Sequence, residues 1–301
     1  MMFLGEHQLK SLYFSHDVLK RYVDNPSYHF QNNDVLLYTI CANDDFEDND
    51  GEYIQCALAC KEDGTKVITA FLCDLAKMPV KAQRYWENFL IDNKCFLYSD
   101  YVTSQLEGQF YKGASIYQAL LDEMKIINEQ CAKIGLPTMF RKTFALTDDE
   151  MREFRPLVNA TSKEFLNFAQ LLHKIVVGQM NVGTFQKTIG VIRGLSSKYT
   201  EGLSVDQKLI LWLKKNVSKL PKKDLDLIES AFEKLGKDRN FQAHEIYRNC
   251  KKNSLNERQK DLMYLVYVAV RQIRLILQNH PDTKSIVIPD CLITGEHIQE
   301  Y

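Results

Sequence analysis

The sequence predicts an α+β N-terminal domain, built on an antiparallel meander with helices, followed by an all-α helical bundle. Three observations predict this division. Residues 34–73 contain three runs rich in β-branched and aromatic residues, separated by turn-forming stretches. Residues 161–278 keep the periodicity of amphipathic helices and include capping patterns. Charge divides the chain as well: residues 1–150 hold 14 Lys and Arg against 23 Asp and Glu, whereas residues 151–301 hold 24 against 16.

The predicted meander has strands at residues 34–42, 52–60 and 66–73, because each run is apolar and is bounded by turn residues. The first connection, residues 43–51, is strongly acidic and is expected to be a solvated loop. Its carboxylates offer oxygen ligands for a divalent cation, but their spacing does not match an EF-hand loop: Asp44, Asp45, Asp48 and Asp50.

Helical segments follow the meander. Pro79 opens a short helix whose apolar stripe is typical of a core face: Ala82, Tyr85, Trp86 and Phe89. Residues 114–134 also have helical periodicity, and Leu136-Pro137 ends it. The stretch after the proline is linker-like. We therefore expect an α+β domain at residues 1–155 and a helical bundle at residues 156–301. The role of the first domain is unknown, and sensing and recruitment are the candidates.

The bundle is defined by its helix starts and stops. Thr161-Ser-Lys-Glu164 and Ser204-Val-Asp-Gln207 are capping-box patterns, and Gly236 is in the position of a C′ glycine. The expected helices begin at residues 161, 183 and 204 and cover residues 225–235, 239–249 and 256–278.

Several classes of protein are excluded or disfavoured. No apolar run approaches the roughly 18 residues that a membrane span requires, and the N-terminus has no secretory signal pattern. A cytoplasmic protein with reduced cysteines is therefore expected. Cys56 and Cys60 lack a second ligand pair, and no Gly-rich phosphate loop is present, so neither a metal nor a cofactor is predicted.

The positive charge of the C-terminal half has two interpretations. It is typical of a protein that binds a phosphate-bearing partner. It is equally consistent with attraction between the basic half and the acidic N-terminal half.

One short stretch, residues 236–244, carries a candidate site. Asp238 is placed as an N-cap, so Arg239 and Asn240 would open a helix with His244 in its second turn. Asn240 and His244 are four residues apart and would share a face. Free backbone N–H groups at a helix start favour a phosphate, Arg binds phosphate in bidentate fashion, and His transfers protons near neutral pH.

This stretch resembles the signature of the HEPN superfamily, in which an arginine and a polar residue precede a histidine, here Arg239-Asn240-Phe-Gln-Ala-His244. The resemblance implies a bundle of four or five helices with the motif at the start of a late helix. It also implies a metal-independent endoribonuclease that forms a homodimer, with two motifs in one cleft. Many members act as toxins or in abortive infection and other antiviral defence systems.

The resemblance assigns catalytic roles to Arg239, Asn240 and His244 in RNA cleavage by 2′-hydroxyl attack. His244 would transfer the proton, Arg239 would stabilise the phosphorane, and Asn240 would orient the phosphate. The expected partner is tRNA, mRNA or rRNA, with a possible cognate regulator. The candidate RNA-binding residues are Tyr247, Arg248, Lys251, Lys252, Arg271 and Arg274. A solvated helix face is the other interpretation of all the basic residues in this set, and it is slightly favoured for Lys251 and Lys252.

A non-catalytic HEPN-like module that binds RNA or protein within a defence or regulatory complex is the alternative function. The last helix is relevant to assembly, because it is apolar on most of its circumference between Leu262 and Val270. Burial inside the bundle would explain this pattern, and so would a homodimer interface through the helical domain.

Overall fold

The computed structural model describes residues 7–23, 25–34, 37–43, 51–91, 94–109, 113–146, 151, 153–158, 160–217, 221–240 and 252–300. The chain divides into two compact units. The sheet unit comprises Met1–Lys112 and Leu146–Asn159, and the helical unit comprises Gly113–Ala145 and Ala160–Tyr301. This division differs from a single boundary near residue 155, since residues 113–145 belong to the helical unit.

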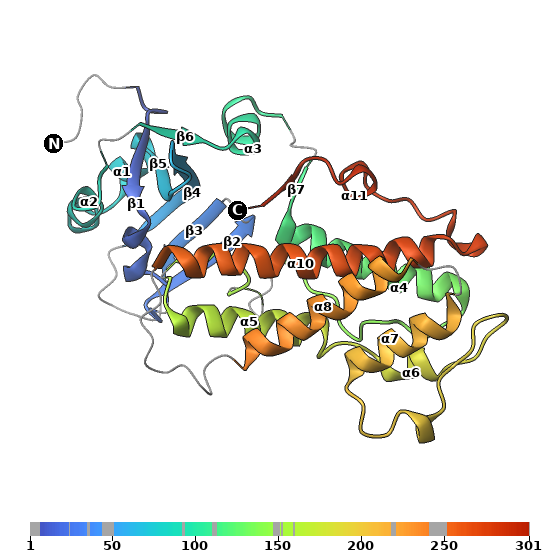
Figure 1. Ribbon diagram of the computed structural model, residues 1–301. Coiled ribbons are helices and arrows are strands. Elements are labelled where there is room, and N and C mark those ends of the chain that lie inside the picture. The colour runs from blue at the N-terminus through green and yellow to red at the C-terminus, as the bar shows by residue number, and fades with distance from the viewer. Residues whose placement is uncertain are drawn as a thin grey trace. The chain divides into compact units, whose positions relative to one another are not determined.

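The sheet unit contains an antiparallel sheet with the strand order β1-β5-β4-β3-β2 (Figure 1). Its strands are β1 (Ser11–Ser15), β2 (Tyr28–Asp34), β3 (Leu37–Ala42), β4 (Tyr53–Lys61) and β5 (Lys66–Phe71). A short strand, β6 (Cys95–Leu97), pairs with the last residues of β4, beyond the part of β4 that β3 covers. The predicted meander is thus confirmed as β3, β4 and β5, while β1 and β2 extend it on both sides.

Short helices complete the sheet unit. They are η1 (His16–Arg21), α1 (Leu72–Lys77), α2 (Val80–Glu87), α3 (Ser99–Tyr101) and the π-helical turn η2 (Val102–Leu106). The core between η1, β1 and α2 is aromatic. Trp86 is fully buried, meets the Phe14 ring edge-on at 4.9 Å, and donates an Nε1 hydrogen bond of 2.8 Å to the Tyr22 hydroxyl. This indole and its partners fix α2 against η1, which positions the exposed face of α2.

The segment 151–158 packs into the sheet unit, although it follows 33 residues of the helical unit in the sequence. The guanidinium of Arg155 lies 5.3 Å from the centre of the Phe30 ring. The carbonyl of Val158 lies 3.1 Å from Nδ1 of His16. Through such contacts this segment belongs to the sheet unit, and the helical unit resumes at Ala160.

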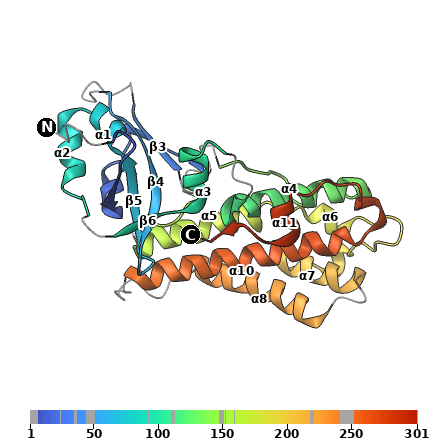
Figure 2. The same cartoon turned by 90° about the horizontal axis from the view of Figure 1, so that it is seen from above.

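The helical unit is built around its longest helix, α10 (Lys252–Gln278), which packs against three other helices (Figures 1 and 2). Those helices are α4 (Ile116–Ile134), α5 (Ser162–Val176) and α8 (Lys222–Arg239). Helix α7 (Val205–Asn216) packs on α8, and α6 (Val182–Gln186) packs on α7. Leu262, Val266 and Val270 of α10 are fully buried. Burial inside the unit therefore accounts for the apolar circumference of the last helix.

Both predicted capping patterns are present. The Thr161 side chain accepts a hydrogen bond from the backbone N–H of Glu164, and Ser204 forms a capping box with Gln207. The helix expected at residue 183 is present but short. It ends at Gln186, and Ile189 and Ile192 instead form an isolated β-bridge with each other.

The C-terminal segment lies along α4 and α10. After α10 come η5 (Pro281–Thr283), α11 (Asp290–Thr294) and β8 (Ile298–Gln299), which pairs in parallel with β7 (Ala114–Ser115) at the start of α4. A further short turn, η4 (Ser197–Tyr199), precedes α7. Within the described ranges, no helix combines the length and apolarity that crossing a membrane requires.

Candidate functional site

The course of α8 corrects the predicted start of the motif helix. Gly236 does not end a helix, and Asp238 does not cap a new one, because α8 continues to Arg239 with Asn240 as its C-cap. Asp238 is 3% exposed and pairs with Arg258 of α10 and, at 3.7 Å, with Lys234. These two ion pairs hold Asp238 in place, and so the last turn of α8 stays helical.

Arg239 consequently lies at the C-terminal end of a helix and not at its start. The helix dipole is negative there and stabilises a cation, whereas it would oppose a phosphate. The prediction that helix N–H groups assist phosphate binding at Arg239 is therefore wrong. His244, Tyr247, Arg248 and Lys251 lie outside the described residues, and so does the side chain of Lys252.

Arg239 has two neighbours whose chemistry suits a site. Its Nη1 lies 3.1 Å from Nε2 and 3.5 Å from Nδ1 of His173, which projects from α5. Its Nε donates a hydrogen bond of 3.3 Å to Oδ1 of Asn240. Arg239 and His173 are half-buried, and Asn240 is exposed. We refer to these three residues as the Arg239 cluster.

The surroundings of His173 in the Arg239 cluster favour the neutral form of its imidazole. Burial lowers the pKa of His173 from its ordinary value of 6.5, and the positive charge of Arg239 lowers it again, while Asp206 of α7 opposes the shift. A neutral imidazole can accept a hydrogen bond from the guanidinium or accept a proton from a substrate. Nothing in the sequence around His173 signals its contact with Arg239, because 66 residues separate the two.

The ion pair of Asp238 and Arg258 fixes the helices around the cluster. Arg258 of α10 binds Asp238 of α8, and its guanidinium lies 5.0 Å from the centre of the Phe165 ring of α5. This arrangement connects all three helices beside Arg239. It therefore limits the movement of the helix end that carries Arg239 and Asn240.

Two predicted RNA-binding residues are engaged elsewhere. Arg274 is 1% exposed, and its Nε and Nη2 bind the Glu123 carboxylate at 2.8 and 3.0 Å. A buried, fully paired guanidinium cannot contact an RNA backbone, so the prediction for Arg274 is wrong. Arg271 is half-buried and donates a hydrogen bond of 3.0 Å to the carbonyl of Ile293. It is therefore partly covered by the C-terminal segment.

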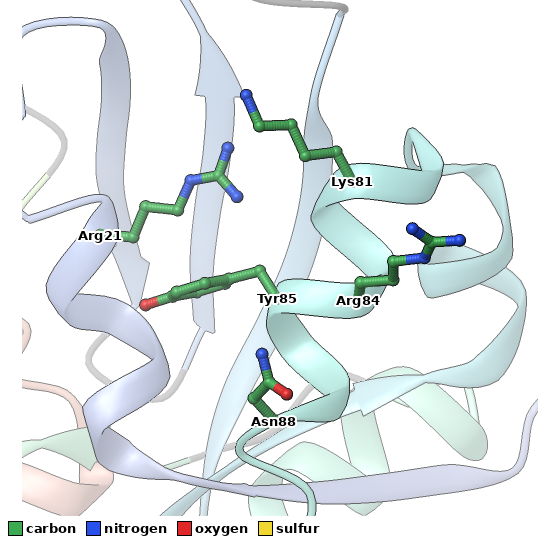
Figure 3. Close-up of a pocket in the computed structure, with 5 residues that line it drawn as sticks. All are labelled: Arg21, Lys81, Arg84, Tyr85 and Asn88. Atoms are coloured by element: carbon green, nitrogen blue, oxygen red, sulfur yellow. The ribbon is translucent and has the colours of Figure 1, made fainter.

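The sheet unit has a basic hollow with a volume of about 590 Å³. The lining side chains come from η1 and α2 and are Arg21, Lys81, Arg84, Tyr85 and Asn88 (Figure 3). The α2 members are spaced i, i+3, i+4 and i+7 and so share one helix face. This spacing was a usable sequence signal, but only the apolar stripe of the same helix was recognised.

Among the described residues, no group of three or more His, Cys, Asp or Glu side chains is placed to hold a metal ion. The acidic loop with Asp44, Asp45, Asp48 and Asp50 lies outside them. Comparison of the chain with protein-family models, with curated proteins and with solved structures finds no match in any of the three.

Proposed function

We propose that the helical unit is a metal-independent endoribonuclease of the HEPN type, in which Arg239, Asn240 and His244 act on RNA. The observation that supports the proposal best is the Arg239 cluster. In it, a guanidinium, an imidazole whose pKa is lowered and an exposed carboxamide converge at one helix end. These groups can stabilise a charged phosphate, influence a proton transfer and orient a phosphate oxygen.

The proposed reaction is an internal transesterification. A base removes the proton of the 2′-hydroxyl, the 2′-oxygen attacks the adjacent phosphorus, and the bond from phosphorus to the 5′-oxygen breaks. An acid protonates the departing 5′-oxygen, which leaves a 2′,3′-cyclic phosphate and a 5′-hydroxyl. We assign proton transfer to His244, charge stabilisation to Arg239 and phosphate orientation to Asn240. His173 is a positioning residue for Arg239, since its ring nitrogen lies 3.1 Å from the guanidinium.

We further propose that the enzyme is a homodimer through the helical unit. A single Arg and a single His are few groups for phosphoryl transfer, and a two-fold axis would double both in one cleft. The burial of α10 within one chain removes the second argument for a dimer. The dimer proposal therefore depends on one argument, the small number of catalytic groups that a single chain supplies. Antiviral defence or toxin activity in the cytoplasm belongs to the same proposal.

A non-catalytic module that binds RNA or protein is the second candidate function. The observation that favours it is that Arg239 is already hydrogen-bonded within the unit, at a helix end whose dipole stabilises its charge. In that case the motif arginine would serve to join α5 and α8.

RNA cleavage by the full-length protein in EDTA tests the proposal. We expect the wild type to produce 2′,3′-cyclic phosphate ends. His244→Ala should reduce the rate about 100-fold or more, and Arg239→Ala should have a similar effect. Lys237→Ala is the matched control, because Lys237 is a cation two residues before Arg239 whose partner is Glu233 on the exposed surface.

The outcomes separate the two candidate functions. Equal cleavage by wild type and His244→Ala, or loss of cleavage on chelation, would contradict the ribonuclease. A protein that is not toxic on expression and copurifies with a partner would favour the module. Sedimentation of the full chain tests the dimer: an active monomer at micromolar concentration would contradict the composite site.

A further inference from the structure

We propose that the basic hollow of the sheet unit binds a small phosphorylated molecule, a phosphate monoester of about nucleotide size. This proposal depends only on the sheet unit and is independent of the ribonuclease. The residues that carry it are Arg21 of η1, three residues of α2 and the C-cap of α2: Lys81, Arg84, Tyr85 and Asn88.

Charge is the first argument. The N-terminal half of the chain is acidic, with 14 Lys and Arg against 23 Asp and Glu over residues 1–150. The hollow is lined by three cations and no carboxylate. Lys81 and Arg84 are exposed and pair with no carboxylate among the described residues. These two cations without a carboxylate partner raise the local potential and attract an anion.

Neighbouring side chains hold the guanidinium of Arg21 in one orientation, whereas Lys81 and Arg84 are exposed. Its Nη2 donates hydrogen bonds to the Tyr28 hydroxyl at 2.8 Å and to Glu52 Oε1 at 2.6 Å. Its guanidinium also lies 5.1 Å from the centre of the Tyr85 ring. These contacts fix the guanidinium plane. Nε and Nη1 remain as donors with no partner in the part of the chain that the structure describes.

The wall opposite Arg21 is rigid as well. The Tyr85 hydroxyl donates a hydrogen bond of 3.0 Å to the carbonyl of Val18 in η1, so its ring connects α2 to η1. Figure 3 shows Arg21 and Lys81 on one side of this ring and Asn88 on the other. Arg84 extends away from Arg21 (Figure 3). A ligand would thus meet Arg21 and Lys81 first, with Arg84 at the edge.

These donors fit a phosphoryl group. Nε and Nη1 of Arg21 can each donate a hydrogen bond to a separate phosphate oxygen, and a lysine on a flexible stem adds a point charge. A dianionic group offsets the two cations that have no carboxylate partner. The volume of about 590 Å³ lies within the range of roughly 300 to 1,000 Å³ typical of small-molecule sites. It is larger than inorganic phosphate alone requires.

Isothermal titration calorimetry of the full chain at low ionic strength tests the site, with AMP and ribose 5-phosphate as probes. Adenosine and ribose are the matched controls without phosphate. We expect saturable binding of the phosphorylated probes only. Lys81→Gln should weaken binding at least about tenfold, as expected when a charge-assisted contact is lost, and Arg84→Gln should weaken it less. Lys77→Gln should bind like the wild type, because Lys77 is a surface cation of α1 paired with Asp74.

Three results with the small-molecule probes would overturn the proposal. They are no saturable binding by the wild type, equal affinity of Lys81→Gln and the wild type, or equal binding of adenosine and AMP. Binding of oligoribonucleotides of increasing length tests whether the hollow is part of a nucleic-acid surface. Affinity that rises with RNA length and exceeds that for AMP would show a nucleic-acid surface in place of a small-molecule site. Circular dichroism of Lys81→Gln and Arg84→Gln verifies that both variants are folded.

Discussion

The Arg239 guanidinium lies 3.1 Å from Nε2 of His173, although 66 residues separate the two in the sequence. The charged guanidinium thus lies beside an imidazole. Burial of the imidazole, together with the charge of Arg239, holds the pKa of His173 below its ordinary value. The pair joins the ends of two helices and determines how the exposed Asn240 is presented. Its electrostatic coupling can be measured whether or not the protein cleaves RNA.

Removing the Arg239 charge should raise the pKa of His173. The neutral imidazole is favoured in part because protonation would place two positive charges side by side. In Arg239→Gln this repulsion is absent, so the titration of the His173 ring should move toward higher pH. Asp206→Asn should have the opposite effect, since Asp206 stabilises the protonated ring. NMR titration of the ring signals measures both shifts, and identical titration curves in the three proteins would contradict the coupling.

Gly236→Ala should stabilise the helical unit by about 0.5 to 1 kcal/mol, the usual gain from replacing a mid-helix glycine. Gly236 lies inside α8, and an added Cβ would meet no atom within 4 Å. Urea unfolding measures the change. The substitution also distinguishes two backbone conformations. If Gly236 were a left-handed C′ residue, as its sequence context indicates, alanine would destabilise the protein instead.

The buried pair of Glu123 and Arg274 should show strong coupling. Burial raises the pKa of Glu123, and the Arg274 hydrogen bonds only oppose this effect. Glu123→Leu leaves a guanidinium buried without its counter-charge, and we expect a loss of about 3 kcal/mol in the free energy of unfolding. Adding Arg274→Met should recover part of that loss. Urea unfolding of both single variants and the double variant measures the coupling, and additive losses would contradict it.

The sheet unit should lose stability as the pH falls below the ordinary pKa of histidine. Burial is the largest cause that lowers the pKa of His16 to about 3, and the charges of Lys66 and Arg155 add to it. The unfolded chain therefore binds a proton near pH 6.5, whereas the folded chain does not, and low pH favours unfolding. The expected loss is about 1 to 2 kcal/mol between about pH 7.5 and pH 5.

His16→Asn provides the comparison for that prediction. Asparagine does not titrate and can still donate a hydrogen bond to the Val158 carbonyl, which lies 3.1 Å from Nδ1 of His16. The variant should therefore lose less stability than the wild type over the same pH interval. Parallel pH dependence of the two proteins would show that His16 is not the group responsible.

The sequence predicted elements whose cause is local. The capping patterns at Thr161 and Ser204 satisfy backbone N–H groups within four residues, and both start helices where expected. The hairpins of β3, β4 and β5 follow from apolar runs and turns that are adjacent in the sequence. Such features depend on neighbours along the chain, and no knowledge of the tertiary structure is needed to predict them.

The incorrect predictions concern residues whose partners are distant. Asp238 is a good N-cap by type, but Arg258, 20 residues later, holds it inside α8. Arg274 is a cation in a basic half, but Glu123 lies 151 residues before it. Residues 113–145 have no compositional sign that they belong to the helical unit. In each case a long-range contact outweighs a local preference, and no periodicity reports such contacts.

The pairing of β7 with β8 determines when the helical unit can be completed during synthesis. Residues 114–115 begin this unit, but their strand partner is residues 298–299. The nascent chain therefore carries α4 without α10 until residue 278 has been translated, and without β8 until residue 299 has been translated. During the first of these intervals, the side chains of α4 that α10 covers in the folded unit lack that partner.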